Sequence, residues 1–368
     1  MTESSETQGP APMEGHGGYN RSSLVQAAGS LPAVPLLEKA AQQVLLPAGP
    51  EPVVIVDYGS SEGRNSLVPL SVAIGILRDR IGRKRPISVV HTDLPGNDFN
   101  ALFQMLVSDP GSYLREDPAI FPSAIGRSFY EQIMPTSSVT LGWSSWAVQW
   151  LSRVPALIPD QVQVAYSRDA ATRAVFSRQA AEDWRVFLSH RAAELKPGGR
   201  LVILSMALDD QGDFGYRAAV DAIYGGLEDL VGDGVITAAE MRRMVIPTFA
   251  RGREDFTAPF AETGSFAGLS FEELEIFYGE DHIWQKFKVH GDPEIFGARW
   301  AAFSRASVGP TLAASLENSS ARAGEFLERL ETRMATRLAA APERTSIPLA
   351  KMVLVKERAL EVYSYSPK

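Results

Sequence analysis

EPVVIVDYG, at residues 51–59, is a short β-branched run between proline and glycine. Such a run is typical of a strand that is buried on both faces of a sheet. Before it, apolar residues fall at helical spacing from Leu31 to Leu46, and a Pro-Ala-Gly-Pro turn follows at 47–50. The pattern therefore predicts a helix, a turn and then a buried strand.

Similar apolar runs recur along the chain with helical stretches between them, and this alternation predicts a parallel, doubly wound α/β sheet. Two later runs would complete a sheet of seven strands. The strands expected after the first are ISVVHTD at 87–93, AIFPSAIG at 119–126, SSVTLGW at 137–143, RLVILSM at 200–206, LEIFYG at 274–279 and KMVLVKE at 351–357.

Two helical segments interrupt this alternation: about 65 residues between the fifth and sixth strands, and the block 292–341, whose leucines mark one apolar face. We expect them to form a helical cap over the C-terminal edge of the sheet. The first 15 residues are rich in Ser, Glu, Pro and Gly, a composition typical of a mobile tail. The predicted boundaries are a tail at 1–15, a core at 16–208, 270–290 and 342–368, and a cap at 209–269 and 291–341.

The composition excludes several classes of function. The net charge of −8 is spread along the chain, so a nucleic-acid partner is not expected. No apolar run approaches the roughly 20 residues of a membrane span, and the polar N-terminus does not resemble a signal peptide, so we expect a cytoplasmic protein. The absence of cysteine rules out disulfides, a thiolate nucleophile and thiolate-bound metals.

The loop after the first strand is where a doubly wound sheet binds a nucleotide-like ligand. Here Gly59 and Gly63 allow a tight turn and a close approach of the backbone to a ligand. Their spacing is not the G-x-G-x-x-G of pyrophosphate sites, which favours S-adenosylmethionine over NAD. Asp57 would then face the methionine end of the cofactor. The alternative is that the loop is only a tight turn.

Asp93 ends the second expected strand, where an acidic side chain can accept hydrogen bonds from both hydroxyls of a ribose. The alternative role is a cap for the helix that begins near Asn97. The segment from Leu94 to Asp98 offers other capping residues, so we favour the ribose role.

Several segments match, in order, the motifs of one known family. They are YNRSSLVQ at 19–26, DYGSSEGRNSL at 57–67, HTDLPGNDFNALF at 91–103, GRSFYEQIMP at 126–135, SSWAVQWLSRVP at 144–155, IPTFARGREDF at 246–256 and ETGSF at 262–266. Together they resemble the SABATH carboxyl methyltransferases, which also include N-methyltransferases of purine alkaloids. The resemblance covers the chain from about Met13 to about Leu360 and implies a class I methyltransferase fold, which is Rossmann-like.

The resemblance also implies site residues. Gln26 and Trp150 would hold the substrate carboxylate, and Trp146 and Gln149 would contact the substrate. This sequence departs from the family's common residues at Ser22, Ser60, Arg64, Trp146 and Gln149, which leaves the cofactor site clearer than the substrate. The positions expected to bind S-adenosylmethionine, and its product S-adenosylhomocysteine, are Tyr19, Ser22, Asp57, Gly59, Asn65, Asp93, Leu94, Ser128 and Phe129.

Methyl transfer to a carboxylate needs no general base, because the acid is already ionised at pH 7. The expected mechanism is an in-line displacement that depends on positioning. Gln26 and Trp150 would aim the carboxylate with uncharged N–H groups, which do not neutralise it. Trp146 and Trp150 are four residues apart and would share one face of a helix if this segment is helical. The alternative is that both tryptophans only pack in the core. No metal is expected.

The cap residues expected to surround the substrate are apolar or aromatic: Val220, Ile223, Tyr224 and Phe249, with Leu227, Ile246 and Phe266 as further candidates. Val220 stands where plant members often carry a Trp, so the cavity would be longer and suit a fatty acid, as in the bacterial fatty-acid O-methyltransferases. Alternatively, these residues form only the core of the cap.

Other functions remain open at this point. Within the family, the substrate is an aromatic acid such as salicylate, benzoate or indole-3-acetate, or the acceptor is a heterocyclic nitrogen. Outside it, the chain is an NAD-dependent oxidoreductase or a non-catalytic S-adenosylmethionine-binding protein. Dimerisation of relatives leaves a homodimer open.

Overall fold

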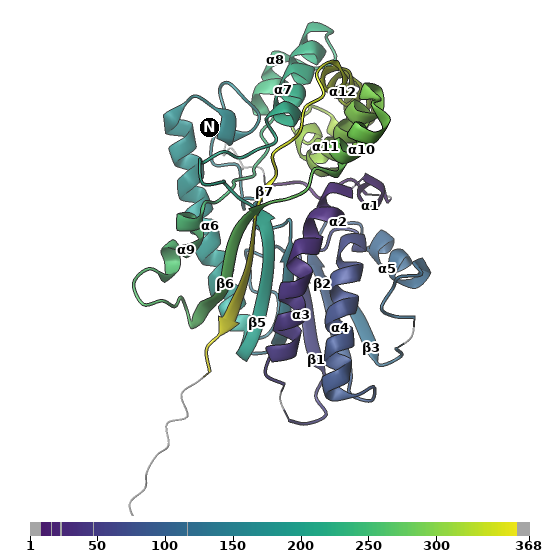
Figure 1. The fold of residues 1–368 in the computed structure, drawn as a ribbon. Coiled ribbons are helices and arrows are strands. Elements are labelled where there is room, and N and C mark those ends of the chain that lie inside the picture. The colour runs from purple at the N-terminus through teal and green to yellow at the C-terminus, as the bar shows by residue number, and fades with distance from the viewer. Residues whose placement is uncertain (1–8, 16, 23, 47, 116, 359–368) are drawn as a thin grey trace, which may run out of the picture.

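The computed structural model describes residues 9–15, 17–22, 24–46, 48–115 and 117–358. They form a seven-stranded sheet of order β3-β2-β1-β4-β5-β7-β6, in which only β7 runs against its neighbours (Figure 1). All seven predicted strands, and the α/β class, are therefore confirmed. The strands are β1 Val53–Tyr58, β2 Ile87–Asp93, β3 Ile120–Gly126, β4 Val139–Ser145, β5 Leu195–Met206, β6 Leu269–Tyr278 and β7 Pro348–Lys356.

Helices cover both faces of the sheet because successive strand residues point to opposite sides. Ile55 of β1 packs in the cluster that contains α3 (Val34–Gln43), α4 (Leu67–Ile81) and α5 (Phe99–Ser108). Its neighbour Val56 packs in the cluster that contains α6 (Ala170–Glu194). The sheet is thus buried on both sides, as the continuous apolar strands predict.

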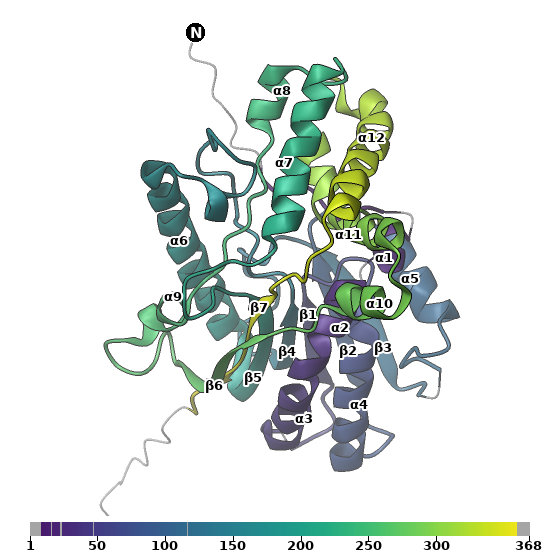
Figure 2. The same ribbon diagram turned by 45° about the horizontal axis from the view of Figure 1, so that its top comes forward.

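The cap lies over the carboxyl ends of the parallel strands (Figures 1 and 2). It contains α7 (Arg217–Gly232), α8 (Ala238–Arg243), α11 (Pro293–Ala313) and α12 (Ser319–Ala340). The boundaries differ from the prediction in two places. Helix α10 (His282–His290) packs on α11, so the second part of the cap begins earlier than predicted. Helix α9 (Arg253–Thr257) packs on α6 of the core, because the Trp184 indole donates to the carbonyl oxygen of Phe256, so α9 is not part of the cap.

The chain begins with two short helices, α1 (Gly18–Ser22) and α2 (Leu24–Ser30), which precede α3. Residues 9–15, predicted as part of a mobile tail, are instead packed against α11. The amide of Ala11 donates to Thr311 Oγ1 at 3.3 Å, and the Glu14 carboxylate lies 3.2 Å from Arg305 Nε. Composition alone misses this, because the stabilising partners lie on α11, nearly 300 residues away. Residues 1–8 of the predicted tail lie outside the described residues.

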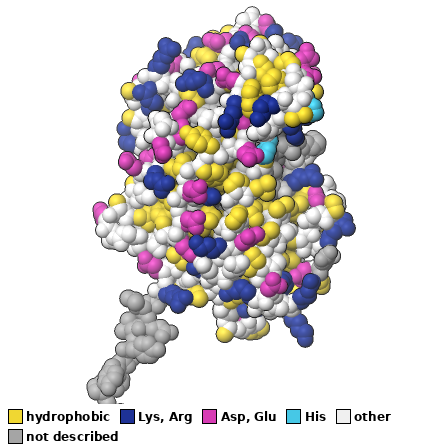
Figure 3. Space-filling model, viewed as in Figure 1, with side chains coloured by type: hydrophobic (Ala, Val, Ile, Leu, Met, Phe, Trp, Pro, Cys, Tyr) yellow, Lys and Arg dark blue, Asp and Glu magenta, His cyan; other side chains and the backbone are white. Residues whose placement is uncertain are grey.

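On the face shown in Figure 3, basic and acidic side chains are interspersed. Within the described ranges, no helix has both the length and the apolar character needed to cross a membrane.

A buried ion pair fixes the segment that follows β3. Arg191 and Glu194, both fully buried near the end of α6, lie 2.7 Å apart. Arg191 donates to the carbonyl oxygens of Phe129 and Glu131, each at 2.8 Å. Glu194 accepts from the amide of Ile133 at 2.6 Å and from the Tyr58 hydroxyl at 2.6 Å. The segment from Phe129 to Ile133 is therefore tied to both α6 and β1.

We expect Arg191→Met to lower the free energy of unfolding by about 3–5 kcal/mol, because it leaves the Glu194 carboxylate buried without its cation. Urea denaturation measures this loss. The matched control is Arg329→Met, which breaks an exposed pair with Glu325 and should cost less than about 1 kcal/mol. Equal losses in the two variants would contradict this account of the pair.

Candidate active site

Two neighbouring cavities lie near the carboxyl ends of the parallel strands, and one of them extends under the cap. The first, here named the strand-end cavity, has about 670 Å³ of empty space and is built by the loops that follow β1, β2, β3 and β4. This is the edge where doubly wound sheets bind their ligands. Its lining is Pro10, Ala11, Pro12, Met13, Tyr19, Gly59, Ser61, Asp93, Leu94, Ser128, Phe129, Tyr130, Ser145, Trp146, Ala147, Trp150, Leu151 and Ser152.

The loop after β1 approaches this cavity closely. Gly59 has a φ of +84°, and a Cβ placed on it would lie 2.5 Å from the Cβ of Ala147, so only glycine fits here. Ser61 also has a left-handed backbone, with a φ of 48°. Its amide donates to Asp93 Oδ2 at 2.7 Å, and its carbonyl oxygen accepts from Asn97 Nδ2 at 2.9 Å. The backbone of this loop therefore lies directly at the wall of the cavity.

Asp93 is half-buried and faces the same cavity. Its Oδ2 accepts from Ser61 and its Oδ1 from the amide of Leu94, at 2.7 Å each. A carboxylate oxygen has about two lone-pair directions, so each oxygen keeps one acceptor site. The alternative role as a helix cap is wrong, because Asp98 caps α5 by accepting from the amide of Ala101. Burial raises the pKa of Asp93 to about 6.

Asp57 lies behind the cavity and does not line it. It is opposite His91 in the parallel register of β1 and β2, and its Oδ2 lies 3.0 Å from His91 Nδ1. His91 Nε2 lies 2.8 Å from the Tyr113 hydroxyl, which completes a buried chain of polar groups. Asp57 was expected to face the ligand. Instead, its carboxylate contacts His91 on the neighbouring strand and does not line the cavity.

The other predicted cofactor residues divide in a similar way. Tyr19, Gly59, Leu94, Ser128 and Phe129 line the strand-end cavity. Asn65 is not in that lining but hydrogen-bonds the Tyr19 side chain. Burial, with a contribution from the nearby Asp93, raises the pKa of Tyr19 above its usual range. Ser22 ends α1, and its side chain lies outside the described part of the structure.

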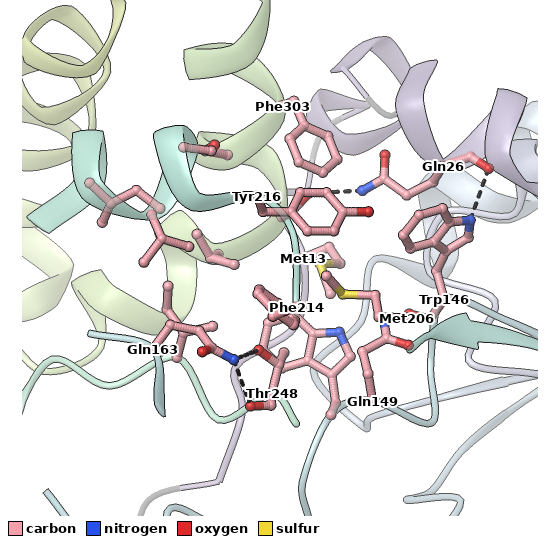
Figure 4. A pocket seen from close by; sticks show the side chains of 18 of the residues that line it. Met13, Gln26, Trp146, Gln149, Gln163, Met206, Phe214, Tyr216, Thr248 and Phe303 are labelled. Carbon is pink, nitrogen blue, oxygen red and sulfur yellow. Dashed lines mark hydrogen bonds between the residues drawn. The ribbon is translucent and has the colours of Figure 1, made fainter. Parts of the chain in front are cut away.

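The second cavity, here named the cap cavity, has about 680 Å³ of empty space (Figure 4). Its lining side chains, among the described residues, are all uncharged. Met13, Tyr19, Trp146 and Trp150 line both cavities, so the two spaces share a wall. The remaining lining of the cap cavity is Gln26, Gln149, Gln163, Met206, Phe214, Tyr216, Ala219, Val220, Ile223, Ile246, Thr248, Phe303, Ser304, Ser307 and Val308.

Gln26 brings to this cavity a side-chain amide with only one of its two polar atoms paired. Its Nε2 donates to Ser307 Oγ at 2.9 Å, and its Oε1 is buried without a hydrogen-bond partner in the described part of the chain. A serine hydroxyl both donates and accepts, so a half-turn of the amide keeps the bond to Ser307 and presents the N–H groups to the cavity instead. The backbone carbonyl oxygen of Gln26 accepts from the Trp146 indole at 3.0 Å, which fixes α2 against the loop after β4 (Figure 4).

The two other glutamines of the cap cavity are already satisfied. Gln149 donates to the carbonyl oxygen of Trp146 at 2.5 Å and accepts from Ser205 Oγ at 3.2 Å. Gln163 donates to the backbone carbonyl oxygen of Thr248 at 3.0 Å and accepts from the amide of Ala165 at 2.5 Å. Both hold the wall in place, and Gln26 is the glutamine with a free polar end.

The structure brings together most of the predicted substrate residues. Gln26, Trp146, Gln149, Trp150, Val220 and Ile223 all line the cap cavity. Tyr224 and Phe249 do not. Tyr224 follows Ile223 on α7 and is thereby turned away from the cavity, toward Glu228 and Asp160. Phe249 packs beside the cluster of Leu151, Ile158 and Val245.

Several lining residues were missed by sequence reasoning, including Met13, Met206, Phe214, Tyr216 and Phe303. Tyr216 could have been predicted from its spacing. It lies directly before α7 and four residues before Val220, and helical spacing places the two side chains on one face. Met13 and Phe303 have no such signal, since they come from distant segments.

This sheet order, with a glycine turn after β1 and an acidic residue at the end of β2, is the class I methyltransferase fold that the sequence predicted. The comparisons with known proteins agree. A family profile described as "SAM dependent carboxyl methyltransferase" matches residues 10–357, and the chain belongs to this family, the SABATH methyltransferases. The cofactor is S-adenosylmethionine, and the enzyme is a carboxyl methyltransferase, as the sequence predicted.

Similar proteins include fungal and plant enzymes. The chain is 33% identical over 249 residues to Methyltransferase LUC1 of Fusarium sp, an alignment that covers 66% of this chain and 65% of that protein. It is 28% identical over 292 residues to Indole-3-acetate O-methyltransferase 1 of Arabidopsis thaliana, covering 72% and 75%. A solved loganic acid methyltransferase with SAH has the same fold, with a TM-score of 0.76, 21% identity and coverage of 95% and 100%.

We expect the affinity for S-adenosylhomocysteine to fall by about tenfold between pH 7 and pH 5. The pKa of Asp93 is about 6, and protonation turns an acceptor that faces the strand-end cavity into a donor. Titration calorimetry across this range measures the effect. Asp93→Asn should bind weakly at both pH values. An affinity of the wild-type protein that is constant from pH 7 to pH 5 would contradict the prediction.

Proposed function

We propose that this enzyme methylates the carboxylate of a medium-chain aliphatic acid, held in the cap cavity by Gln26 and Trp150. The observation that carries the proposal is the uncharged, largely apolar cap cavity that shares a wall with the strand-end cavity. An acid in the cap cavity and a cofactor in the strand-end cavity would meet at Tyr19, Trp146 and Trp150.

The strand-end cavity fits S-adenosylmethionine by the chemistry of its lining. The two free acceptor sites of Asp93 suit the two ribose hydroxyls, and the aromatic ring of Phe129 suits the adenine beside Ser128. Gly59 and Ser61 offer close backbone approach without a phosphate-binding pattern. Asp57 and Asn65 would act indirectly, Asp57 through the buried contact to His91 and Asn65 through Tyr19.

In this mechanism the cofactor supplies a methyl group made electrophilic by a positively charged sulfur. The protein's part is to position the acid. The amide N–H of Gln26 and the indole N–H of Trp150 would hold the carboxylate without neutralising it, whereas an arginine would form a charge-assisted pair and reduce its nucleophilicity. Good orientation alone supplies effective molarities of up to about 10⁵–10⁸ M. No residue has to remove a proton, because the acid enters ionised.

The aliphatic part of the cap cavity's lining favours a chain over a ring. It includes Ala219, Val220, Ile223, Ile246 and Val308, which are small or branched aliphatic side chains. They leave space for a substrate that extends away from the carboxylate. Aromatic acids are the second candidate, and the named substrates of the plant relatives, indole-3-acetate, benzoate and salicylate, favour them.

Rates on a series of C6 to C14 fatty acids, beside benzoate, salicylate and indole-3-acetate, test this specificity. Burial of each added methylene contributes about 0.8 kcal/mol of binding free energy, so kcat/KM should rise about fourfold per carbon until the cavity is full. Val220→Trp should lower kcat/KM for the longest acids more than about tenfold, since the indole takes up space in the cavity that Val220 lines. The control is Val68→Trp, which adds the same bulk at an exposed site. Equal or better rates on the aromatic acids would defeat the aliphatic proposal.

Removing either N–H group of the carboxylate clamp should slow methylation. We expect Gln26→Ala and Trp150→Phe each to lower kcat/KM by about 10–100-fold, as for a lost hydrogen bond to a charged group, while S-adenosylhomocysteine binds Gln26→Ala as it binds wild type. Trp284→Phe is the control for tryptophan replacement, because Trp284 packs against Phe287 and Phe296 in the cap. Unchanged kcat/KM in both clamp variants would refute the clamp.

A further inference from the structure

Tyr216 carries a polar group that the fold leaves unused. Its side chain lines the cap cavity and is 4% exposed, and its hydroxyl has no hydrogen-bond partner in the described part of the chain. A buried hydroxyl without a partner is unfavourable and rare in folded proteins. The group therefore calls for an explanation in terms of what enters the cavity.

The surrounding structure fixes this hydroxyl in position. Tyr216 has a left-handed backbone, with a φ of 60°, directly before α7. Its amide donates to the carbonyl oxygen of Ser346 at 3.2 Å, and its ring packs against Phe214 and Trp300 with centroids 5.5 and 6.5 Å apart. A strained, non-glycine conformation persists only where its neighbours over-determine it, and such residues cluster at binding sites. Ser61 and Trp146, which line the strand-end cavity, share this conformation.

The direction of the side chain matters as much as its burial. In Figure 4 the hydroxyl of Tyr216 points toward the side of the cavity where Gln26 and Trp146 lie. Trp146 belongs to the wall shared with the strand-end cavity. The hydroxyl is thus directed to the end of the cap cavity where the carboxylate would be methylated.

The chemical state of Tyr216 suits a donor to an anion. Burial, and secondarily the charge of Asp281, hold the pKa of Tyr216 well above its usual range. The hydroxyl therefore keeps its proton and stays uncharged at neutral pH. An apolar chain has no acceptor to offer it, whereas a carboxylate has about four lone-pair directions.

We propose that the Tyr216 hydroxyl donates a hydrogen bond to the substrate carboxylate, as a third uncharged donor beside Gln26 and Trp150. This inference rests on the proposed placement of the acid in the cap cavity. It gives α7, which also carries Val220 and Ile223, a direct part in recognising the head of the substrate as well as its chain. One helix would then set both the position of the carboxylate and the length of acid that fits.

The test is Tyr216→Phe, which removes one oxygen and keeps the ring. We expect kcat/KM to fall by about 10–100-fold, mainly through a higher KM for the acid, while the affinity for S-adenosylhomocysteine stays within twofold. The melting temperature should stay the same or rise, because the variant no longer buries an unpartnered hydroxyl. Activity and stability thus change in ways that a purely structural role for the hydroxyl would not produce.

Tyr278→Phe is the matched control, because it makes the same chemical change at a residue outside both cavities. Tyr278 is an exposed residue of β6, and its hydroxyl donates to Asp209 Oδ2 at 2.8 Å. Removal of this hydroxyl should leave kcat/KM within about twofold of the wild-type value. The comparison thus separates a hydroxyl that lines the cap cavity from one that is bonded at the surface.

The assay uses whichever acid the wild-type enzyme methylates fastest. It also includes acids that carry no oxygen outside the carboxyl group. A preference for aromatic acids would overturn the aliphatic specificity and leave this test intact. Unchanged kcat/KM in Tyr216→Phe would overturn the proposal, with or without a lower melting temperature. A loss confined to acids that carry an additional hydroxyl or keto group would also overturn it, because the contact would then be to the chain.

Discussion

A carboxylate that leaves water for an apolar cavity loses hydration, and it can act as a nucleophile only if the protein replaces that hydration without neutralising its charge. A buried arginine would replace the lost hydration, but it would also neutralise the charge of the carboxylate. The cap cavity has uncharged lining side chains in the described part of the chain, and it shares a wall with the cavity at the strand ends. The cation that an ionised acid would meet is then the sulfonium of the cofactor, and the protein's contribution is orientation.

The polar groups around the cap cavity divide into two sets. Gln149, Gln163 and Ser304 are hydrogen-bonded within the protein and hold the wall in place. Gln26 and Tyr216 each keep a buried polar atom without a partner in the described residues. Such atoms weaken the folded protein unless a ligand pairs with them. Both atoms belong to residues of one cavity, where Trp146 and Tyr216 also have left-handed backbones. Under the proposed placement of the acid, the substrate would pair with them.

The sequence predicts the sheet well because its strands are β-branched runs, and it predicts strand ends less well. The fifth strand begins at Leu195, five residues before the predicted start, since a Gly-Gly step at 198–199 interrupts its pairing with β4 without ending it. The predicted sixth strand starts five residues late, because its first part mixes polar and apolar residues as an outer strand does. Apolar runs indicate which residues are buried, whereas the starts of β5 and β6 are set by hydrogen bonding to the neighbouring strands.

Some residues of the site could be predicted and others could not. Asp93 was expected because it ends a strand, whereas Leu94, Ser128, Phe129 and Trp150 were expected from the family resemblance, and all five line the cavities. Asp57 differs because its cross-strand partner His91 cannot be identified from one strand alone. Met13 was missed because its segment is ordered by contacts to α11, which are invisible to composition.

The most direct test of this account is a crystal structure with S-adenosylhomocysteine and a fatty acid bound together. The account predicts a carboxylate within hydrogen-bonding distance of the Gln26 amide and the Trp150 indole, beside the cofactor sulfur, with the chain running toward Val220 and Ile223. An acid whose carboxylate lies away from that wall, or is paired with a lysine or arginine, would contradict it.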